Sequence, residues 1–347
     1  MGLDTLYPNF NFSLNLIEAI VMGDYTFNIV SNYDIGYKVY VAMIKCFTNN
    51  YHIFIIITTI IDCLLLFICF IRYSPYPILS ILLFLVYSGF QIQYDLLRNI
   101  KAILIFFFSI YYLERNRKII VIGLLILEIL FHSSSIVYLP VYYIIKKNIL
   151  KYKKIIYSLT LIGVIIFIAQ NQIIIKFLEL LQNLKLNIIF PNSLLIKLNT
   201  YLKSEFFLVN RGIGLGIMEK FFLFFLIMKN SKKIIKIKYG KIFANMWILL
   251  FFLYLYTNDV RIIQERFSLL IVCSYWIIYP IILKLYKGKI KLLLVLIIFS
   301  YSSLKIYKSF NEKIKSYPLI KYENILFDSK SFEEKRKIWV ETIKKYK

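Results

Sequence analysis

The fold is decided by residues 91–154, which read QIQYDLLRNIKAILIFFFSIYYLERNRKIIVIGLLILEILFHSSSIVYLPVYYIIKKNILKYKK. The stretch contains two apolar blocks, and these carry Arg98 and His132 where hydrocarbon or its edge is expected. Ionisable residues at membrane depth are unfavourable in free energy, so each of them indicates a functional site. The stretch therefore predicts membrane helices that hold a charged site.

Basic clusters bracket the second apolar block on both sides: Arg115, Arg117 and Lys118 before it, and Lys146, Lys147, Lys151, Lys153 and Lys154 after it. The positive-inside rule places both clusters in the cytoplasm, so residues 119–145 are expected to form a hairpin with residues 132–135 at its turn. Each arm of ~13 residues would be ~20 Å long as helix, short of the ~30 Å hydrocarbon core. The turn would then lie near the outer interface or below it, in a protein-lined cavity. The alternative is one tilted span of about 27 residues, ~40 Å long, which would put the second cluster outside.

Composition predicts an all-α polytopic integral membrane protein. The 347 residues are 60% hydrophobic and have a mean hydropathy of +0.69, whereas soluble domains are about 45–50% apolar. The net charge of +24 comes mainly from lysines in short loops between apolar spans, so topology explains it rather than nucleic acid. The remaining positive charge suits anionic membrane lipids or pyrophosphate-linked lipids. The four cysteines have no metal-binding spacing.

The apolar blocks predict a single transmembrane domain over residues 1–304 with about ten spanning or half-spanning helices, followed by a polar tail at 305–347. Beyond the hairpin, spans are expected at 52–71, 77–93, 97–113, 155–169, 217–228, 242–257, 267–285 and 292–303. The segment before residue 52 is expected to be extramembrane or interfacial. The outer loop 170–211 carries an apolar periodicity that indicates an amphipathic helix on the membrane surface, and 258–266 is expected to be a short outer loop.

Six short motifs occur in order along nearly the whole chain. They are Gly2-Leu3-Asp4-Thr5-Leu6-Tyr7; Asp34-Ile35-Gly36-Tyr37; Leu97-Arg98-Asn99-Ile100-Lys101-Ala102; Phe131-His132-Ser133-Ser134 with Leu139-Pro140; Glu265-Arg266-Phe267 with Tyr279-Pro280; and Tyr317-Pro318 through Tyr322. Together they resemble the EpsG/Wzy family of bacterial O-antigen and exopolysaccharide polymerases. The chain departs from the family pattern at Asn99, where the family has Gln, and at Lys101, which stands among apolar residues.

The resemblance implies a GT-C-like glycosyltransferase in the bacterial inner membrane, with its active site facing the periplasm or exterior. The implied reaction moves a growing glycan from undecaprenyl pyrophosphate to the next lipid-linked repeat unit of an O-antigen, capsule or exopolysaccharide. The implied partners are these lipid-linked oligosaccharides and membrane lipids, and a chain-length regulator is a further partner that the resemblance allows. No cofactor is expected, and no obligatory metal, because no outer loop carries a carboxylate pair at metal spacing.

Arg98 and His132 are the leading site candidates. An Arg binds phosphate bidentately and stays charged, which suits a pyrophosphate leaving group. A His titrates in the range needed to take a proton from the acceptor hydroxyl. Glu128, four residues before His132 on the same helical face, is expected to orient it as a further catalytic group. The structural alternatives are an Arg98 salt bridge to Asp95 and a His132 that only caps the turn.

The remaining candidates lie toward the expected outer ends of the spans. Arg266 and Arg211 are predicted to bind the substrate anion, with head-group snorkelling as the alternative. The motifs add Asp4 as an acceptor-side catalytic carboxylate, with capping of local structure as the alternative. They also add Tyr7 and Tyr317 as substrate-binding residues. Asp62 lies in the middle of a predicted span, where a structural hydrogen bond and a catalytic role are both open.

Two other functions use a similar composition. A lipid-linked glycan flippase or transporter would distribute charges along a central path, whereas here they gather at expected outer helix ends. An O-antigen ligase-like transferase shares the polymerase chemistry, and the sequence does not separate the two.

Overall fold

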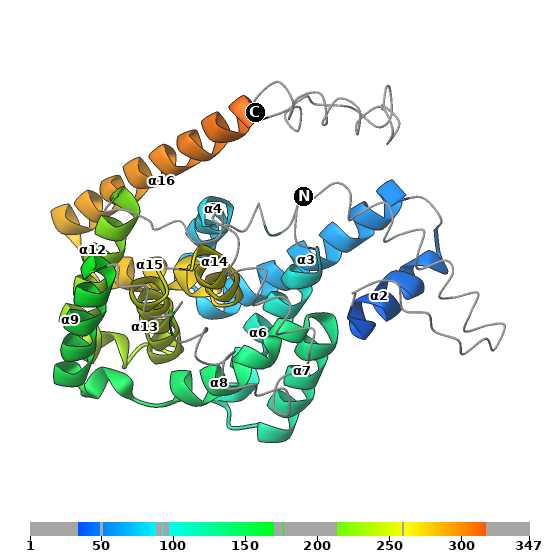
Figure 1. Ribbon diagram of the computed structural model, residues 1–347, viewed down its shortest axis with the longest axis horizontal. Helices are drawn as coiled ribbons and strands as arrows, with labels where there is room; N and C mark the ends of the chain where they lie inside the picture. Colours follow the sequence, from blue (N-terminus) through cyan, green and yellow to red (C-terminus); the bar gives the residue numbers. More distant parts are fainter. Residues whose placement is uncertain are drawn as a thin grey trace. The chain divides into compact units, whose positions relative to one another are not determined.

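A computed structural model describes residues 34–48, 51–87, 92, 97–169, 176, 214–258 and 260–316. In these ranges all regular secondary structure is helical, which confirms the predicted all-α class for this part of the chain (Figure 1). The chain divides into two compact units. The larger comprises residues 29–40 and 55–285, and the smaller comprises residues 1–28, 41–54 and 286–347.

The described elements of the larger unit are all helical. They are α2 (Ile35–Lys45) and α3 (Tyr51–Tyr73), each in part, then α4 (Pro77–Val86), α6 (Leu97–Glu114), α7 (Lys118–Phe131), the 3-10 turn η1 (Ser133–Val137), α8 (Tyr138–Lys146), the 3-10 turn η2 (Ile149–Lys151), α9 (Lys153–Ala169), α12 (Leu215–Ile234), α13 (Gly240–Tyr256), α14 (Arg261–Leu270) and α15 (Cys273–Leu285). The smaller unit contains α16 (Gly288–Ser316).

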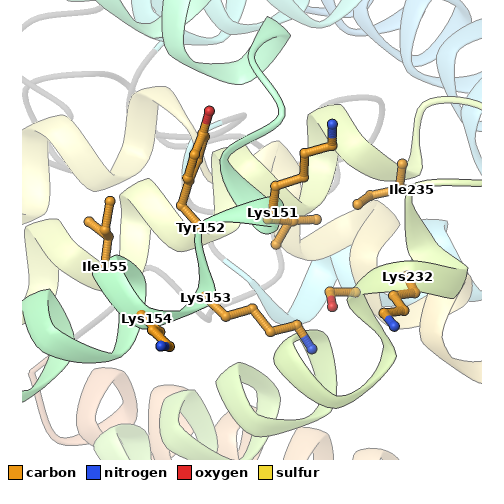
Figure 2. A pocket seen from close by; sticks show the side chains of 9 residues that line it. Lys151, Tyr152, Lys153, Lys154, Ile155, Lys232 and Ile235 are labelled. Atoms are coloured by element: carbon orange, nitrogen blue, oxygen red, sulfur yellow. The ribbon is translucent and has the colours of Figure 1, made fainter.

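Helices α6 and α13, which both pack against α8, form the core of the larger unit. Helix α6 packs against α7 and α8, while α13 packs against α8, α9, α12 and α15, and α15 also packs against α4 (Figure 1). Large aromatic rings fill the contacts. Phe106 stacks on Tyr138 at 3.9 Å between centroids, and the fully buried Trp276 meets Phe84 edge-on at 5.0 Å. The start of α9 and the end of α12 leave a hollow between them (Figure 2).

Polar side chains tie these helices together inside the core. The Glu219 carboxylate of α12 accepts hydrogen bonds from Tyr87, at 3.1 Å, and from Tyr279. Asn245 of α13 donates to the carbonyl oxygens of Ile145 and Lys147 at 2.9 and 2.6 Å. Buried polar groups are stable only when they are paired, so these contacts fix how the helices dock.

Two helices in the described residues are long and apolar enough to cross a membrane, over Ile53–Tyr73 and Gly288–Tyr307. A third crossing results if Gln264–Leu270 and Cys273–Leu285, which meet at 59°, count as one broken span. The first of these confirms that the span predicted at 52–71 is a continuous apolar helix of sufficient length. Many large apolar side chains on α3, α7, α9 and α16 are exposed, as expected for surfaces that face lipid.

The hairpin region departs from a single tilted helix. Helix α7 ends at Phe131, His132 is extended at φ −154° and ψ 109°, and a 3-10 turn leads into α8. The predicted break at His132 is therefore confirmed, and the alternative of one continuous helix over 119–145 is wrong.

Three other boundaries were predicted incorrectly. Residues 261–266, expected in the polar loop 258–266, belong to helix α14, and the span expected at 267–285 is bent at residues 271–272. The last helix runs over Gly288–Ser316, well beyond the end expected at residue 303. Of the outer loop 170–211, only residue 176 is described.

Candidate functional site

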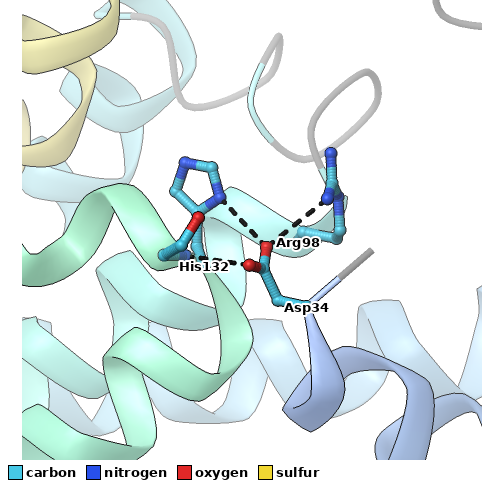
Figure 3. Close-up of polar contacts among 4 residues, drawn as sticks. Asp34, Arg98 and His132 are labelled. Atoms are coloured by element: carbon cyan, nitrogen blue, oxygen red, sulfur yellow. Dashed lines mark hydrogen bonds and ion pairs between the residues drawn. The ribbon is translucent and has the colours of Figure 1, made fainter. Parts of the chain in front are cut away.

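The structure brings Arg98 and His132 together through a third residue, Asp34 (Figure 3). One Asp34 carboxylate oxygen, Oδ2, lies 3.4 Å from Nη1 of Arg98 and 3.7 Å from Nδ1 of His132. The other oxygen, Oδ1, accepts a hydrogen bond from the backbone N–H of Ser133 at 3.2 Å. These residues come from three separate segments, so the fold assembles this Asp34 cluster of Asp34, Arg98 and His132.

The side chains of the Asp34 cluster are partly accessible. Those of Arg98, Asp34 and His132 are 31%, 17% and 12% exposed. Burial raises the pKa of the Asp34 carboxyl, but the contacts with His132, Ser133 and Arg98 outweigh burial and hold this pKa below its ordinary value of 3.8. Asp34 is therefore a carboxylate at neutral pH, and it faces two groups that carry or can take positive charge.

Helix α2 positions the Asp34 carboxylate, because Asp34 directly precedes it. A Cβ at Gly36 would lie 2.8 Å from the backbone carbonyl carbon and oxygen of Leu130, so α2 approaches the last turn of α7 closely only because residue 36 is glycine. Tyr40 adds an edge contact with Phe131, with ring centroids 5.9 Å apart. The Asp-x-Gly-aromatic step thus brings Asp34 to the point where α7 ends and His132 begins.

The end of α7 presents both His132 and Ser133 to Asp34. The His132 N–H still bonds to the Glu128 carbonyl, as in a helix, but its extended backbone then turns the chain into the 3-10 segment. This directs the Ser133 N–H and the imidazole Nδ1 to the same carboxylate. Figure 3 shows the second ring nitrogen of His132 on the side away from Asp34. The Nδ1–Oδ2 distance of 3.7 Å is longer than a hydrogen bond, so the contact between Asp34 and the imidazole is electrostatic.

The Glu128 carboxylate makes a different contact from the one expected. It is fully buried and accepts a hydrogen bond from the Tyr142 hydroxyl at 2.6 Å, and that hydroxyl also contacts Ser109. The expected contact of Glu128 with His132 is therefore corrected: Glu128 bonds to Tyr142, and it is the Asp34 carboxylate that lies at ion-pair distance from the imidazole, 3.7 Å from Nδ1. Glu128 links α7 to α8 and α6.

Arg98 and His132 are the candidates that the structure joins. Arg266 is exposed on α14, and in the described ranges no ion pair or hydrogen bond connects it to the Asp34 cluster. Asp4, Tyr7, Arg211 and Tyr317 lie outside the described residues, as does Asp95, the alternative partner of Arg98.

A second ion pair lies one helical turn along α6. Lys101 Nζ is 2.5 Å from an oxygen of Asp62 on α3, and the two residues are 5% and 0% exposed. The ring of Tyr40 lies 4.9 Å from the same ammonium group, and the Tyr40 hydroxyl bonds to Thr58 at 3.0 Å. The Lys101–Asp62 pair thus joins α3 to α6 beneath α2.

Asp34 was absent from the candidates chosen from sequence. It lies 64 residues before Arg98 in a segment of ordinary polarity. A carboxylate is common in such a segment, so its position alone did not indicate a functional site. The available signal was its place in the Asp-x-Gly-aromatic motif.

Comparison with family models gives a match to the EpsG family over residues 9–324. The match covers most of the 347 residues. The chain belongs to the EpsG family. The resemblance drawn from the six motifs is thereby confirmed. Searches of curated proteins and of solved structures give no match.

Membership of the EpsG family associates the protein with membranes and with polysaccharide biosynthesis, through a function of the polymerase type. The whole Asp34 cluster lies within the matched residues. The hydrophobic helices agree with the membrane setting.

Proposed function

We propose that this EpsG-family protein polymerises lipid-linked glycan repeat units and that the Asp34 cluster is its catalytic site. In this proposal the donor is a growing glycan on undecaprenyl pyrophosphate, and the acceptor is a hydroxyl of the next lipid-linked repeat unit. The observation that carries the proposal is the convergence of an arginine and a histidine on one ionised carboxylate.

Arg98 would hold the leaving group. Its guanidinium is permanently charged and carries its N–H donors in a planar fork, and its side chain is 31% exposed, which suits the binding of a pyrophosphate. As the bond between the anomeric carbon and the pyrophosphate oxygen breaks, negative charge grows on that oxygen. A fixed cation at this place stabilises the transition state more than the ground state.

His132 would act as the general base. It takes the proton of the acceptor hydroxyl while the hydroxyl oxygen forms its bond to the anomeric carbon, and undecaprenyl pyrophosphate departs. Asp34, on the Nδ1 side, stabilises the imidazolium that forms through its negative charge. The buried aspartate of a Ser-His-Asp catalytic triad stabilises its imidazolium in the same way.

The proposal includes a GT-C-like architecture of about ten spanning or half-spanning helices in the bacterial inner membrane. The site then faces the periplasm, because the charge rule places the basic clusters on either side of residues 119–145 in the cytoplasm and His132 lies between them.

Replacing the chromosomal gene with a His132→Ala variant tests this function. We expect polymer to fall by roughly 10²- to 10⁴-fold, since this is the usual contribution of a general base, and single repeat units to reach the cell surface. Ser134→Ala is the matched control, because Ser134 is exposed in the same turn and makes no contact with the cluster in the described structure.

Other outcomes would replace the polymerase function. Repeat units held on the cytoplasmic side would indicate a flippase, and full-length polymer retained on the lipid carrier would indicate a ligase. Normal polymer from the His132→Ala strain would remove this residue from the mechanism.

A further inference from the structure

A hollow of 510 Å³ lies away from the Asp34 cluster, between the segment that starts α9 and the end of α12 (Figure 2). It is lined by residues 150–155 together with Ser231, Lys232 and Ile235. All of these residues belong to the larger unit.

The lining of the hollow is strongly basic. Lys151, Lys153, Lys154 and Lys232 contribute four ammonium groups, and none of the nine lining residues is acidic. Lys153 donates to the Met228 carbonyl at 2.9 Å, which ties this lysine across to α12. Figure 2 shows the side chains of Lys153 and Lys232 extending from opposite walls. Like charges that line one hollow repel one another, so an anion bound in it would be stabilising.

Two further features of the hollow suit an oxyanion. The Ser231 residue is 1% exposed, and its hydroxyl has no hydrogen-bond partner in the described structure although it lines the hollow. A buried hydroxyl without a partner is unfavourable in free energy, and an anion oxygen would satisfy it. The first turn of α9 is also part of the wall, and its N–H groups lack acceptors within the helix and carry the positive end of the helix dipole.

We propose that this hollow binds a phosphate group. Four lysines, a buried hydroxyl donor and a helix N-terminus supply many donors and much positive charge. A phosphate, which has several acceptor oxygens, matches them better than a carboxylate does. The phosphate belongs either to the head group of an anionic phospholipid or to inorganic phosphate. The inference does not rest on the polymerase function, because the positive-inside rule places this basic hollow on the cytoplasmic side and the proposed catalytic site on the other.

The test uses the full chain purified in detergent, as wild type and as two charge-matched double variants. Lys151→Ala with Lys232→Ala removes two charges from the hollow. Lys233→Ala with Lys236→Ala removes two exposed charges from the adjoining segment, and neither residue lines the hollow. Ser231→Ala removes the buried hydroxyl alone.

Two probes distinguish the sources of the phosphate. Inorganic phosphate is titrated against chloride at equal ionic strength while the thermal midpoint is followed, because a ligand of the folded state raises this midpoint. Retention of phosphatidylglycerol is measured by native mass spectrometry after extraction from nanodiscs of phosphatidylglycerol and phosphatidylcholine.

Binding of either probe to the wild type, about tenfold weaker in the hollow variant and unchanged in the control variant, supports the site. A response to inorganic phosphate identifies a soluble ligand, whereas a response to phosphatidylglycerol alone identifies a lipid head group. Ser231→Ala is expected to weaken the same binding by roughly two- to tenfold. Equal loss in both double variants, or no binding of either probe, overturns the proposal.

Discussion

Helix α6 holds two ion pairs whose cations are three residues apart, and the two pairs differ mainly in exposure. Lys101 and Asp62 are 5% and 0% exposed, under the ring of Tyr40. Arg98 and Asp34 have side chains that are 31% and 17% exposed, and they share a third partner in His132. The pairs use the same chemistry, a cation from α6 and a carboxylate from an earlier segment.

This difference in exposure separates a structural pair from one able to act. A buried pair has its charges satisfied by each other and leaves nothing for a ligand, while removal of one partner leaves an unpaired buried charge. In the Asp34 cluster the side chains of Arg98 and His132 are partly exposed, so a substrate can reach them. We therefore expect the Lys101–Asp62 pair to determine stability and the Asp34 cluster to determine activity.

The largest expected effect comes from Asp62→Ala, which leaves Lys101 buried without its carboxylate. Removing one partner of a buried pair destabilises a protein by about 3–5 kcal/mol, so the amount of folded protein in the membrane should fall severely. Detergent-extracted yield and thermal midpoint measure this loss.

The double variant Asp62→Asn with Lys101→Met is the control for that effect. Replacing a buried pair by uncharged groups of similar size is often neutral, so we expect yield to recover. A double variant as unstable as Asp62→Ala would show that the charges themselves are needed.

Gly36→Ala tests how the Asp34 cluster is positioned. The added Cβ would lie 2.8 Å from backbone atoms of Leu130, so α2 must move away from α7 and carry Asp34 with it. Misplacement of a catalytic group by about 1 Å can reduce a rate by about 10²-fold. Polymerisation rate and protein level should be measured together, because a fall in level that matches the fall in rate would indicate a packing defect alone.

Arg98→Lys keeps the charge of the open pair and removes the guanidinium fork. We expect an about tenfold slower polymerisation at unchanged protein level, since one charge-assisted hydrogen bond to the pyrophosphate is lost. Arg115→Lys is the matched control, because Arg115 is exposed at the end of the α6 segment and contacts the Tyr111 ring. Full activity of the Arg98→Lys enzyme would show that only the positive charge of Arg98 is needed and that its guanidinium fork is not.

The smallest effect concerns acid stability. The pKa of Asp34 is lower in the folded protein than its ordinary value of 3.8, so the folded state binds this proton less tightly than the unfolded state does. The stabilisation is complete above 3.8 and is lost as the pH falls through the folded value. The difference in thermal midpoint between wild type and Asp34→Asn should therefore shrink below pH 3.8. A difference that stays constant would mean that the carboxylate is not stabilised by its neighbours.

The sequence was sufficient to predict the site residues that interrupt apolar blocks, because a charged or ionisable side chain is unfavourable there. Arg98 and His132 stand out because charge and imidazole interrupt apolar blocks, and the break at His132 follows from the polar serines after it. Asp34 did not stand out, since a carboxylate in a moderately polar segment is ordinary and its partners are distant in sequence. Only tertiary packing through Gly36 brings it to the site.

The same reasoning explains the error at α14. Residues 258–266 are rich in charged and amide side chains, which suggested a loop, but the sequence alternates these with apolar residues at helical spacing. The bend at residues 271–272 has no proline or glycine to indicate it, although Pro280 lies within α15. Composition alone could not locate that break.

A double-mutant cycle on Asp34 and His132 tests most directly whether the cluster acts as one unit. The measurement is the polymerisation rate in reconstituted membranes of Asp34→Asn, His132→Ala and the variant that carries both. If Asp34 works through the imidazole, the double variant should be no slower than the slower single variant, because removing the second member of a unit adds little. Rate losses that multiply would show that the two residues act independently, and would contradict the assignment of Asp34 as the partner of His132.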